Sequence, residues 1–426
     1  MNINPCKFTL SQNRVLPHSG LSLMLAVSAI ILTGCNDHDH INVDFQPYDV
    51  PNSVVVTDLD GDGKNDIAVA YTHIDNNFPN AGFVSTIIQS HSSAGTFSKG
   101  VDMAIGSNPA ILAAGNLDEA NGVDLVSANA YSNNVSVLLQ GTTAGVFSAA
   151  SNVTVGSTST PAYPNSVAVG DVNGDGLADI AVADLGPGGN VYVMLQDSAN
   201  HGHFLAPISL SVGNLVSSVA IADVNGDGLG DVVTASYDTY GSNGRVSVFI
   251  QNATTHGTFL TRVDYAAGAV PTTVKIADVN GDGKPDLIVA DRGQHQAGNS
   301  GVSVLLQSAT TAGTFLTPVT YATAYGSIDV AVGDLNGDGK PDLVVANLGG
   351  YWTGSISVLL QDPTQAGVYN TATNYPGVFG PLGVAIGDLN GDGKPDIAIA
   401  DGTRAAVMFQ SMTTAGTFAP PSMVGL

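Results

Sequence analysis

Apolar and polar positions alternate along the chain in a pattern of short strands separated by turns. An apolar run such as residues 167–170 leads into a polar loop, and a second apolar run, residues 180–183, follows that loop. After a loop of variable length, an alternating segment such as residues 301–307 ends in Gln. A turn with Gly and an aromatic residue then precedes a last strand, for example residues 315–321. Alternation with a period of two between such turns predicts β-strands, four in each unit.

The polar loop recurs at intervals of 52 to 58 residues. Six intact copies share the pattern Asp-x-(Asn/Asp)-Gly-Asp-Gly-x-x-Asp and begin at Asp58, Asp171, Asp223, Asp278, Asp334 and Asp388. A degenerate copy begins at Asn116, keeps Asp118 and Asp124 at the third and ninth positions, and has Ala120 at the fifth. The third strand of every unit ends in Gln, at Gln89, Gln140, Gln196, Gln251, Gln307, Gln361 and Gln410. The aromatic residue after the turn also recurs seven times, as Phe97, Phe147, Phe204, Phe259, Phe315, Tyr369 and Phe418. Periods of this length indicate a repeat architecture.

Seven such units predict an all-β fold, a seven-bladed β-propeller of four-stranded antiparallel blades over residues 51–426. The units start near residues 51, 108, 164, 216, 271, 327 and 381. Composition agrees, because 51 Gly residues, abundant Val and Thr, and only 11% charged residues are typical of β-proteins rich in turns. The formal net charge is −24 and no basic stripe is present, so nucleic acid is not an expected partner.

The recurring loop has the chemistry of a cage for Ca²⁺. Oxygen side chains stand at its first, third, fifth and ninth positions, Gly at the sixth permits a sharp turn, and the seventh carbonyl can supply a further ligand. The six intact loops hold 19 of the 36 acidic residues, and clustered carboxylates repel one another without a cation. We therefore expect six structural Ca²⁺ ions, one for each intact loop. The predicted ligands are Asp58, Asp60, Asp62, Lys64, Asp66, Asp171, Asn173, Asp175, Leu177, Asp179, Asp223, Asn225, Asp227, Leu229, Asp231, Asp278, Asn280, Asp282, Lys284, Asp286, Asp334, Asn336, Asp338, Lys340, Asp342, Asp388, Asn390, Asp392, Lys394 and Asp396.

The N-terminal segment is typical of an export signal. Lys7 and Arg14 precede an apolar stretch at residues 21–32, which is too short to span a bilayer. The Leu-Thr-Gly-Cys sequence that follows resembles the lipobox of bacterial lipoproteins, in which cleavage before the cysteine is followed by its acylation. We expect a signal peptide at residues 1–34 and a lipidated N-terminus with a tether at residues 35–50. An ordinary secretory signal with a chance cysteine is the alternative.

Cys35 is therefore the predicted lipidation site, and its lipid is expected to anchor the protein to a membrane. The one other cysteine, Cys6, lies in the predicted signal peptide, so neither a disulfide nor a cysteine nucleophile is expected in the mature protein. The predicted location is the bacterial cell envelope. The outer membrane or cell surface is favoured over the inner membrane. The reason is that residue 36, directly after the predicted lipidated cysteine, is Asn and not the Asp that resembles an inner-membrane retention signal.

The loop between two short strands, the Gln-ended strand and the Gly-Thr-Phe turn together resemble FG-GAP and VCBS repeats, which are related to the calcium-bearing blades of integrin α-subunit propellers. The resemblance covers about residues 51–426. It implies blades that run from an inner first strand to an outer fourth strand. It also implies roles in adhesion or as carbohydrate-associated modules of secreted enzymes. The loop at Asn116 departs from the family pattern, which puts a metal there in doubt.

The loops between second and third strands vary most in length and are expected on the rim opposite the calcium loops. Exposed aromatic rings beside polar groups suit recognition of a glycan or a protein, and shielding of the loop backbone is the alternative explanation. The candidate ligand-binding residues on this rim are Tyr71, Phe78, Tyr237, Tyr240, Arg245, Arg292, Tyr351 and Trp352.

No catalytic motif is found in the sequence, and no catalytic residue is predicted. Outside the calcium loops, Asp75, Asp238 and Asp291 are the acids that glycoside chemistry could use, but the sequence does not pair them. The sequence therefore predicts a monomeric, lipid-anchored, calcium-stabilised module for binding or adhesion. A secreted polysaccharide-active enzyme on the same scaffold is the alternative, and a purely structural role ranks third.

Overall fold

The computed structural model describes residues 48–424, apart from 75–79, 91–94, 121, 157–160, 187, 295–298 and 351–352. Residues 45–426 form one compact unit. The predicted signal peptide, Cys35 and most of the predicted tether lie outside the described residues. Within the described ranges the secondary structure is β-strand without helices, and so no helix there is long and apolar enough to cross a membrane.

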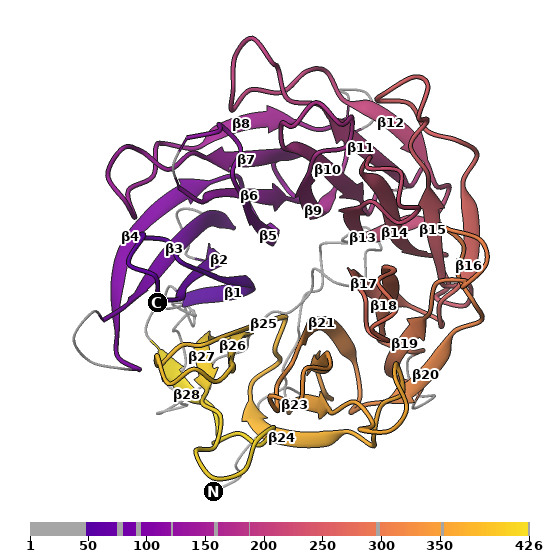
Figure 1. The fold of residues 1–426 in the computed structure, drawn as a ribbon. Coiled ribbons are helices and arrows are strands. Elements are labelled where there is room, and N and C mark those ends of the chain that lie inside the picture. The colour runs from indigo at the N-terminus through magenta and orange to yellow at the C-terminus, as the bar shows by residue number, and fades with distance from the viewer. Residues whose placement is uncertain are drawn as a thin grey trace, which may run out of the picture. The chain divides into compact units, whose positions relative to one another are not determined.

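Seven four-stranded antiparallel sheets form the blades of a propeller, in which each sheet follows the chain in order from its inner to its outer strand (Figure 1). We number the blades 1 to 7 along the chain. The inner strands are β1 (Tyr48–Thr57), β5 (Pro109–Gly115), β9 (Pro164–Gly170), β13 (Leu215–Ala222), β17 (Pro271–Ala277), β21 (Ser327–Gly333) and β25 (Gly383–Gly387). The second strands are β2 (Asp66–Ile74), β6 (Asp124–Asn129), β10 (Asp179–Asp184), β14 (Asp231–Tyr237), β18 (Asp286–Asp291), β22 (Asp342–Asn347) and β26 (Asp396–Asp401). The predicted fold class is confirmed.

The outer half of each blade is built from the third and fourth strands. The third strands are β3 (Ala81–Gln89), β7 (Asn134–Leu138), β11 (Asn190–Met194), β15 (Arg245–Phe249), β19 (Gly301–Leu305), β23 (Gly354–Leu359) and β27 (Arg404–Met408). The fourth strands are β4 (Phe97–Ile105), β8 (Ser151–Thr154), β12 (Ile208–Ser211), β16 (Val263–Ala266), β20 (Val319–Ala322), β24 (Thr373–Val378) and β28 (Ser422–Val424). In this meander, the loops between strands one and two and between strands three and four share one rim, which we call the metal rim. The loops between strands two and three and the links between blades share the other, the variable rim.

The hydrophobic core lies between the blades. The second strand of a blade is buried on both faces, which explains why sequences such as Ile-Ala-Val-Ala lack polar alternation. At the interface of blades 2 and 3, for example, Val126 and Val137 pack in one cluster with Val182 and Met194. Comparable clusters join every other pair of neighbouring blades.

Blade 1 packs against blade 7 to close the ring. Val54 and Ile67 of blade 1 belong to the same buried cluster as Ala398 and Val407 of blade 7. β1 pairs with β2 and β28 pairs with β27, so each terminal strand stays in its own sheet. The ring is therefore closed by side-chain packing between two complete blades, and β1 begins three residues before the boundary expected from the sequence.

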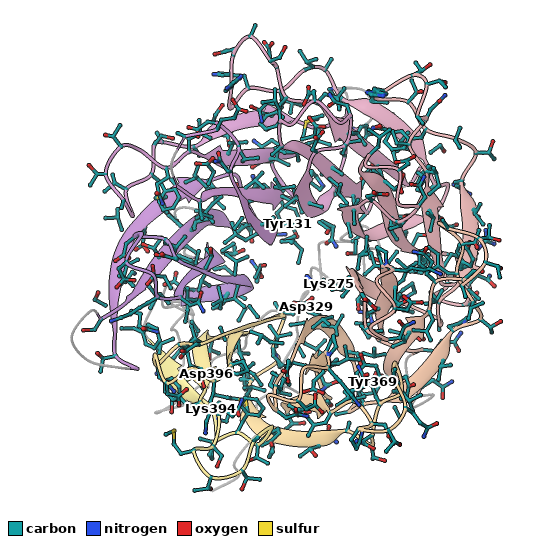
Figure 2. The ribbon with its side chains drawn as sticks, viewed as in Figure 1. Tyr131, Lys275, Asp329, Tyr369, Lys394 and Asp396 are labelled. Atoms are coloured by element: carbon teal, nitrogen blue, oxygen red, sulfur yellow. The ribbon has the colours of Figure 1, made fainter. Side chains whose placement is uncertain are left out.

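Side-chain hydrogen bonds also link neighbouring inner strands around the central opening. Ser53 Oγ accepts the Leu112 N–H at 3.1 Å, and Asp329 Oδ2 accepts the Val384 N–H at 3.0 Å. Ser166 and Ser218 accept equivalent bonds from blades 4 and 5. Figure 2 labels Asp329 beside the opening. Its carboxylate is thus an internal tie between blades 6 and 7.

Candidate functional site

The first Asp of each intact loop holds the loop closed around its carboxylate. In the loop that begins at Asp334, Oδ1 accepts the Gly337 N–H at 2.7 Å and Oδ2 accepts the Gly339 N–H at 2.8 Å. Both glycines have positive φ, 78° and 79°, a conformation that other residues adopt only with strain. The same pair of hydrogen bonds recurs in the other five intact loops, at Asp58, Asp171, Asp223, Asp278 and Asp388.

The third and fifth side chains fold back toward the same loop. Asn336 Oδ1 accepts the Asp338 N–H at 2.8 Å, and Asp338 Oδ1 accepts the Lys340 N–H at 2.9 Å. In the first loop, where Asp60 replaces Asn, ligand oxygens of Asp58, Asp60 and Asp66 all lie within 4.8 Å of one another. The donors are carboxylate and amide oxygens without nitrogen or sulfur, which is the set preferred by a hard divalent cation. The loop residues therefore fit Ca²⁺.

The ninth Asp is buried beneath the loop. Asp342 has no exposed surface; its Oδ2 accepts the Leu335 N–H at 2.9 Å and its Oδ1 accepts the Gln361 N–H at 2.7 Å. Burial is the main cause that raises the pKa of Asp342 to about 6. Its counterparts Asp66, Asp179, Asp231, Asp286 and Asp396 have their pKa values raised to about 6 by the same cause. A cation beside these carboxylates would favour their ionised form.

The degenerate loop keeps the buried ninth residue and loses the first. Asp124 accepts the Leu117 N–H at 2.6 Å and the Gln140 N–H at 2.7 Å, as its counterparts do. Asn116, in contrast, donates its side-chain amide to the Ala120 carbonyl at 2.9 Å. The ninth carboxylate therefore has a structural role that does not depend on a complete set of cation ligands.

In four blades, the side chain of the Gln that ends the third strand donates a hydrogen bond to the first loop of the preceding blade. Gln361 Nε2 donates to the Val279 carbonyl in the blade 5 loop at 2.8 Å and to the Pro341 carbonyl in its own loop at 2.9 Å. Its Oε1 accepts the Gly367 N–H at 3.1 Å. Gln140, Gln307 and Gln410 make the same bond to the preceding blade. The sequence shows that this Gln recurs in every unit, and the structure shows that in these four blades it joins neighbouring blades by hydrogen bonds.

Lysine at the seventh loop position adds a second tie on the metal rim. Lys394 Nζ donates to the Ser411 carbonyl at 3.1 Å, and Lys340 Nζ donates to the Asp362 carbonyl at 3.2 Å. Figure 2 labels Lys394 and Asp396 in blade 7. The sequence predicts that the backbone carbonyls of these lysines are cation ligands. Their side chains additionally fasten the loop to the turn between the third and fourth strands.

On the variable rim, the structure places two of the predicted ligand-binding tyrosines in the core. Tyr71 is 4% exposed and stacks on Phe83 with ring centroids 5.5 Å apart. Tyr237 is 6% exposed and packs in a cluster with Leu185. Their rings therefore support the loops and present no face to a ligand. Phe78, Tyr351 and Trp352 lie outside the described residues.

Among the described residues of this rim, four other aromatic side chains are exposed. Tyr240 is 91% exposed, as the sequence predicts. Tyr131, Tyr325 and Phe379 are 43%, 38% and 41% exposed, and the sequence does not single them out because they lie outside the long loops. These three lie in short connections, in the loop after β6 and in the links that lead to blades 6 and 7. Exposed rings are thus spread over several blades of the variable rim.

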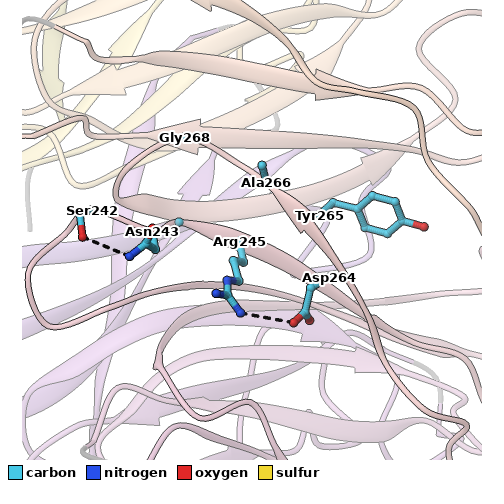
Figure 3. Close-up of a pocket in the computed structure, with 8 residues that line it drawn as sticks. Ser242, Asn243, Arg245, Asp264, Tyr265, Ala266 and Gly268 are labelled. Atoms are coloured by element: carbon cyan, nitrogen blue, oxygen red, sulfur yellow. Dashed lines mark hydrogen bonds and ion pairs between the residues drawn. The ribbon is translucent and has the colours of Figure 1, made fainter.

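A cavity of about 400 Å³ lies beside Tyr240's loop on blade 4, and Figure 3 shows the residues that line it. Arg245 Nη1 lies 3.6 Å from Asp264 Oδ2, and the Arg245 side chain is nearly half exposed. Arg262 Nε lies 3.2 Å from Asp264 Oδ1, which also accepts the Ser247 hydroxyl at 2.7 Å. Two guanidinium groups therefore share one carboxylate. The predicted Arg292 is half-buried, and its backbone N–H donates to the Val270 carbonyl at 3.0 Å.

The two described acids that could have served an enzyme are engaged in loop structure. Asp291 is buried, and its carboxylate accepts the N–H groups of Ala269, Val270 and Gly293 at 2.7 to 3.0 Å. Asp238 is a surface residue, and the hydrogen bond from the Ser242 N–H is the main cause that lowers its pKa to about 2. Both carboxylates therefore accept hydrogen bonds that shape their own loops. Asp75 lies outside the described residues.

Solved structures share the fold at low sequence identity. A proposed 6-phosphogluconolactonase from Bacteroides uniformis superposes with a TM-score of 0.56 at 15% identity, covering 78% of this chain and 87% of the other. A second protein with that proposed activity, from Bacteroides fragilis, gives 0.51 at 16% identity, covering 78% and 86%. A protein from Lactobacillus plantarum gives 0.51 at 15% identity, covering 76% and 84%. At these identities the likeness concerns the propeller alone.

Comparison with protein-family models gives the family directly, whereas a search of curated protein sequences finds no match. The model of the FG-GAP-like repeat matches residues 116–182, 171–234, 224–289, 278–345 and 341–399. The model of the FG-GAP repeat matches residues 50–87. These matches cover most of the propeller, and they include the degenerate loop and its intact neighbours. The chain therefore belongs to the FG-GAP repeat family.

Proposed function

We propose that this protein is a calcium-stabilised, lipid-anchored binding module of the bacterial cell envelope, which recognises a glycan or a protein through its variable rim. The observation that carries the proposal is the repeated loop geometry. In each of six loops, the first Asp organises the backbone while further oxygen side chains fold into the same loop. The metal is structural in this proposal, because six equivalent loops on one rim suit a scaffold better than a catalytic centre.

The expected energetic effect of calcium is large compared with the stability of a domain. Extracellular sites of this type bind Ca²⁺ with dissociation constants of about 10⁻⁴ to 10⁻³ M. At a free concentration ten times the dissociation constant, each site adds about 1.4 kcal/mol by mass action, and six independent sites add about 8 kcal/mol. Net stabilities of domains are about 5 to 15 kcal/mol. Calcium is therefore expected to supply stability comparable to the net stability of a typical domain.

The proposed anchor is a lipid on Cys35. Replacement of Cys35 by Ala is expected to move the protein from the membrane pellet to the soluble envelope fraction, while the unchanged protein stays in the pellet until detergent is added. If Cys35→Ala protein remains in the membrane pellet to the same extent, the anchor is not at this residue.

Ligand recognition is proposed for the exposed aromatic residues of the variable rim, with Tyr240 as the most exposed ring. A flat apolar ring with a polar tip can stack on a sugar or fill a pocket of a protein partner. A glycan array and envelope-protein overlay, both with Ca²⁺ present, test this. Tyr240→Ala is expected to reduce binding at least about tenfold, the effect of losing about 1.4 kcal/mol of contact energy. Leu316→Ala is the matched control, because Leu316 is 52% exposed near the metal rim. Equal effects of both substitutions would contradict binding at the variable rim.

A further inference from the structure

Five of the six intact loops contain Asn followed by Gly at their third and fourth positions. The pairs are Asn173–Gly174, Asn225–Gly226, Asn280–Gly281, Asn336–Gly337 and Asn390–Gly391. Asn before Gly is open to an intramolecular reaction, because Gly has no Cβ to shield its backbone nitrogen. The remaining intact loop has Asp60–Gly61 at the same positions. The loops therefore repeat a potential modification site in addition to the cation ligands.

The reaction is deamidation. The Gly nitrogen attacks the carbonyl carbon of the Asn carboxamide, a new C–N bond forms, and the original C–N bond of the carboxamide breaks with loss of its nitrogen as ammonia. The backbone proton of Gly leaves with that ammonia. Water then opens the resulting five-membered succinimide at either carbonyl, which yields Asp or isoaspartate. No oxidant, reductant or cofactor is required.

Both reacting groups are held by other partners in this structure. The Gly337 N–H, which must give up its proton, is donated to Asp334 Oδ1 at 2.7 Å. The Asn336 side-chain oxygen accepts the Asp338 N–H at 2.8 Å, which directs the carboxamide toward the fifth residue. The Gly nitrogens of the other four loops are bound by their first Asp at 2.6 to 2.7 Å. The Asn oxygens there accept the same bond at 2.8 to 2.9 Å.

We propose that these five asparagines are latent deamidation sites, and that the first Asp of each loop suppresses the reaction by holding the Gly nitrogen. The protecting hydrogen bond forms between residues of the loop itself. Protection therefore does not require a bound Ca²⁺ ion. The bond is present in all six intact copies of the loop, so protection is a property of the intact repeat.

The two products differ in their effect on the loop. Conversion of Asn336 to Asp would reproduce the ligand set of the first loop, in which Asp58, Asp60 and Asp66 already bring three carboxylates within 4.8 Å. Isoaspartate instead inserts a carbon into the backbone between two residues whose spacing closes the loop. We therefore expect the loop to keep its conformation when Asn336 becomes Asp and to be distorted when it becomes isoaspartate.

The test uses the full-length protein, purified and incubated with Ca²⁺ present, with deamidation at each site followed by peptide mass spectrometry. Asp334→Ala removes the acceptor of the Gly337 N–H and is expected to accelerate deamidation of Asn336 at least about tenfold, the factor typical of losing one charge-assisted hydrogen bond. Asn390 in the same molecule is the internal reference and should keep its rate. Enzymatic methylation of isoaspartate measures the second product independently.

Asp338→Ala is the matched control. It removes a predicted cation ligand from the same loop but leaves the Asp334 carboxylate in place, so Asn336 should deamidate at the unchanged rate. Equal acceleration in Asp334→Ala and Asp338→Ala would overturn the inference and assign the protection to the bound cation. Unchanged deamidation in folded Asp334→Ala protein would also overturn it. Asp388→Ala repeats the test at Asn390, should circular dichroism show that the first variant is unfolded.

Discussion

The hydrogen bonds of the Gln361 side chain predict a loss of stability when this residue is replaced by Met. Gln361 is 2% exposed and makes three hydrogen bonds, one of them to the blade 5 loop through the Val279 carbonyl. Met has a similar length and fills the same space without donating or accepting these bonds. The substitution therefore isolates the polar contribution of the amide from its packing.

The magnitude follows from the three bonds. A buried neutral hydrogen bond contributes about 1 kcal/mol, and a backbone group left without a partner costs more than that. The Pro341 carbonyl keeps a partner because it also accepts the Tyr369 hydroxyl at 3.1 Å, whereas the Gly367 N–H and the Val279 carbonyl lose the Gln361 amide. We expect Gln361→Met to lower the free energy of unfolding by about 3 kcal/mol.

Gln251 supplies the matched control in the same position of blade 4. It is 1% exposed, and within the described residues neither its side-chain nitrogen nor its side-chain oxygen has a hydrogen-bond partner. Gln251→Met therefore removes no such bond and is expected to be neutral or stabilising by about 1 kcal/mol. Urea denaturation with Ca²⁺ present, followed by circular dichroism, measures both. Equal destabilisation by the two substitutions would refute the role assigned to the Gln amide.

Two further predictions concern the buried ninth residue of the loops. Asp124→Ala and Asp342→Ala each remove two hydrogen bonds from backbone N–H groups to a carboxylate, so both should cost about 3 to 5 kcal/mol. Metal analysis should show one fewer Ca²⁺ only for Asp342→Ala, and an ion lost with Asp124→Ala would contradict the assignment of the degenerate loop. In excess chelator, the ninth-position carboxylates with pKa raised to about 6 bind protons more tightly in the folded than in the unfolded protein. Stability without metal should therefore be highest at about pH 4 and fall as the pH rises to about 7, and thermal melts showing the opposite slope would contradict this.

The repeat pattern was sufficient to predict the architecture, because the loop, the Gln and the aromatic residue recur independently at the same period. It could not predict the partners of the Gln. Gln361 and Val279 are 82 residues apart, and their contact depends on how one blade packs on the next. The closure of the ring likewise follows from packing of Val54 against blade 7, which no local signal reveals.

The exposed aromatic residues of the variable rim were predicted only in part. Tyr71 occupies the strand position that Asp184 and Asp401 occupy in other blades, and all three side chains are buried beneath the links. Tyr237 corresponds to Leu185, which is also buried. Alignment of the repeats with one another would have indicated core positions for both tyrosines. Exposure of Tyr131 and Phe379 depends instead on the path of a short loop and a short link, for which the hydrophobic pattern has no signal.

The most direct test of the account is to count bound Ca²⁺ by mass spectrometry while following thermal unfolding of residues 36–426, first in excess chelator and then across a calcium titration. We predict six ions per molecule, one for each intact loop, and a midpoint of unfolding that rises steeply with Ca²⁺. An unchanged midpoint with one ion or none bound would contradict the central claim, and the Asp-rich loops would then be surface turns closed by their own hydrogen bonds.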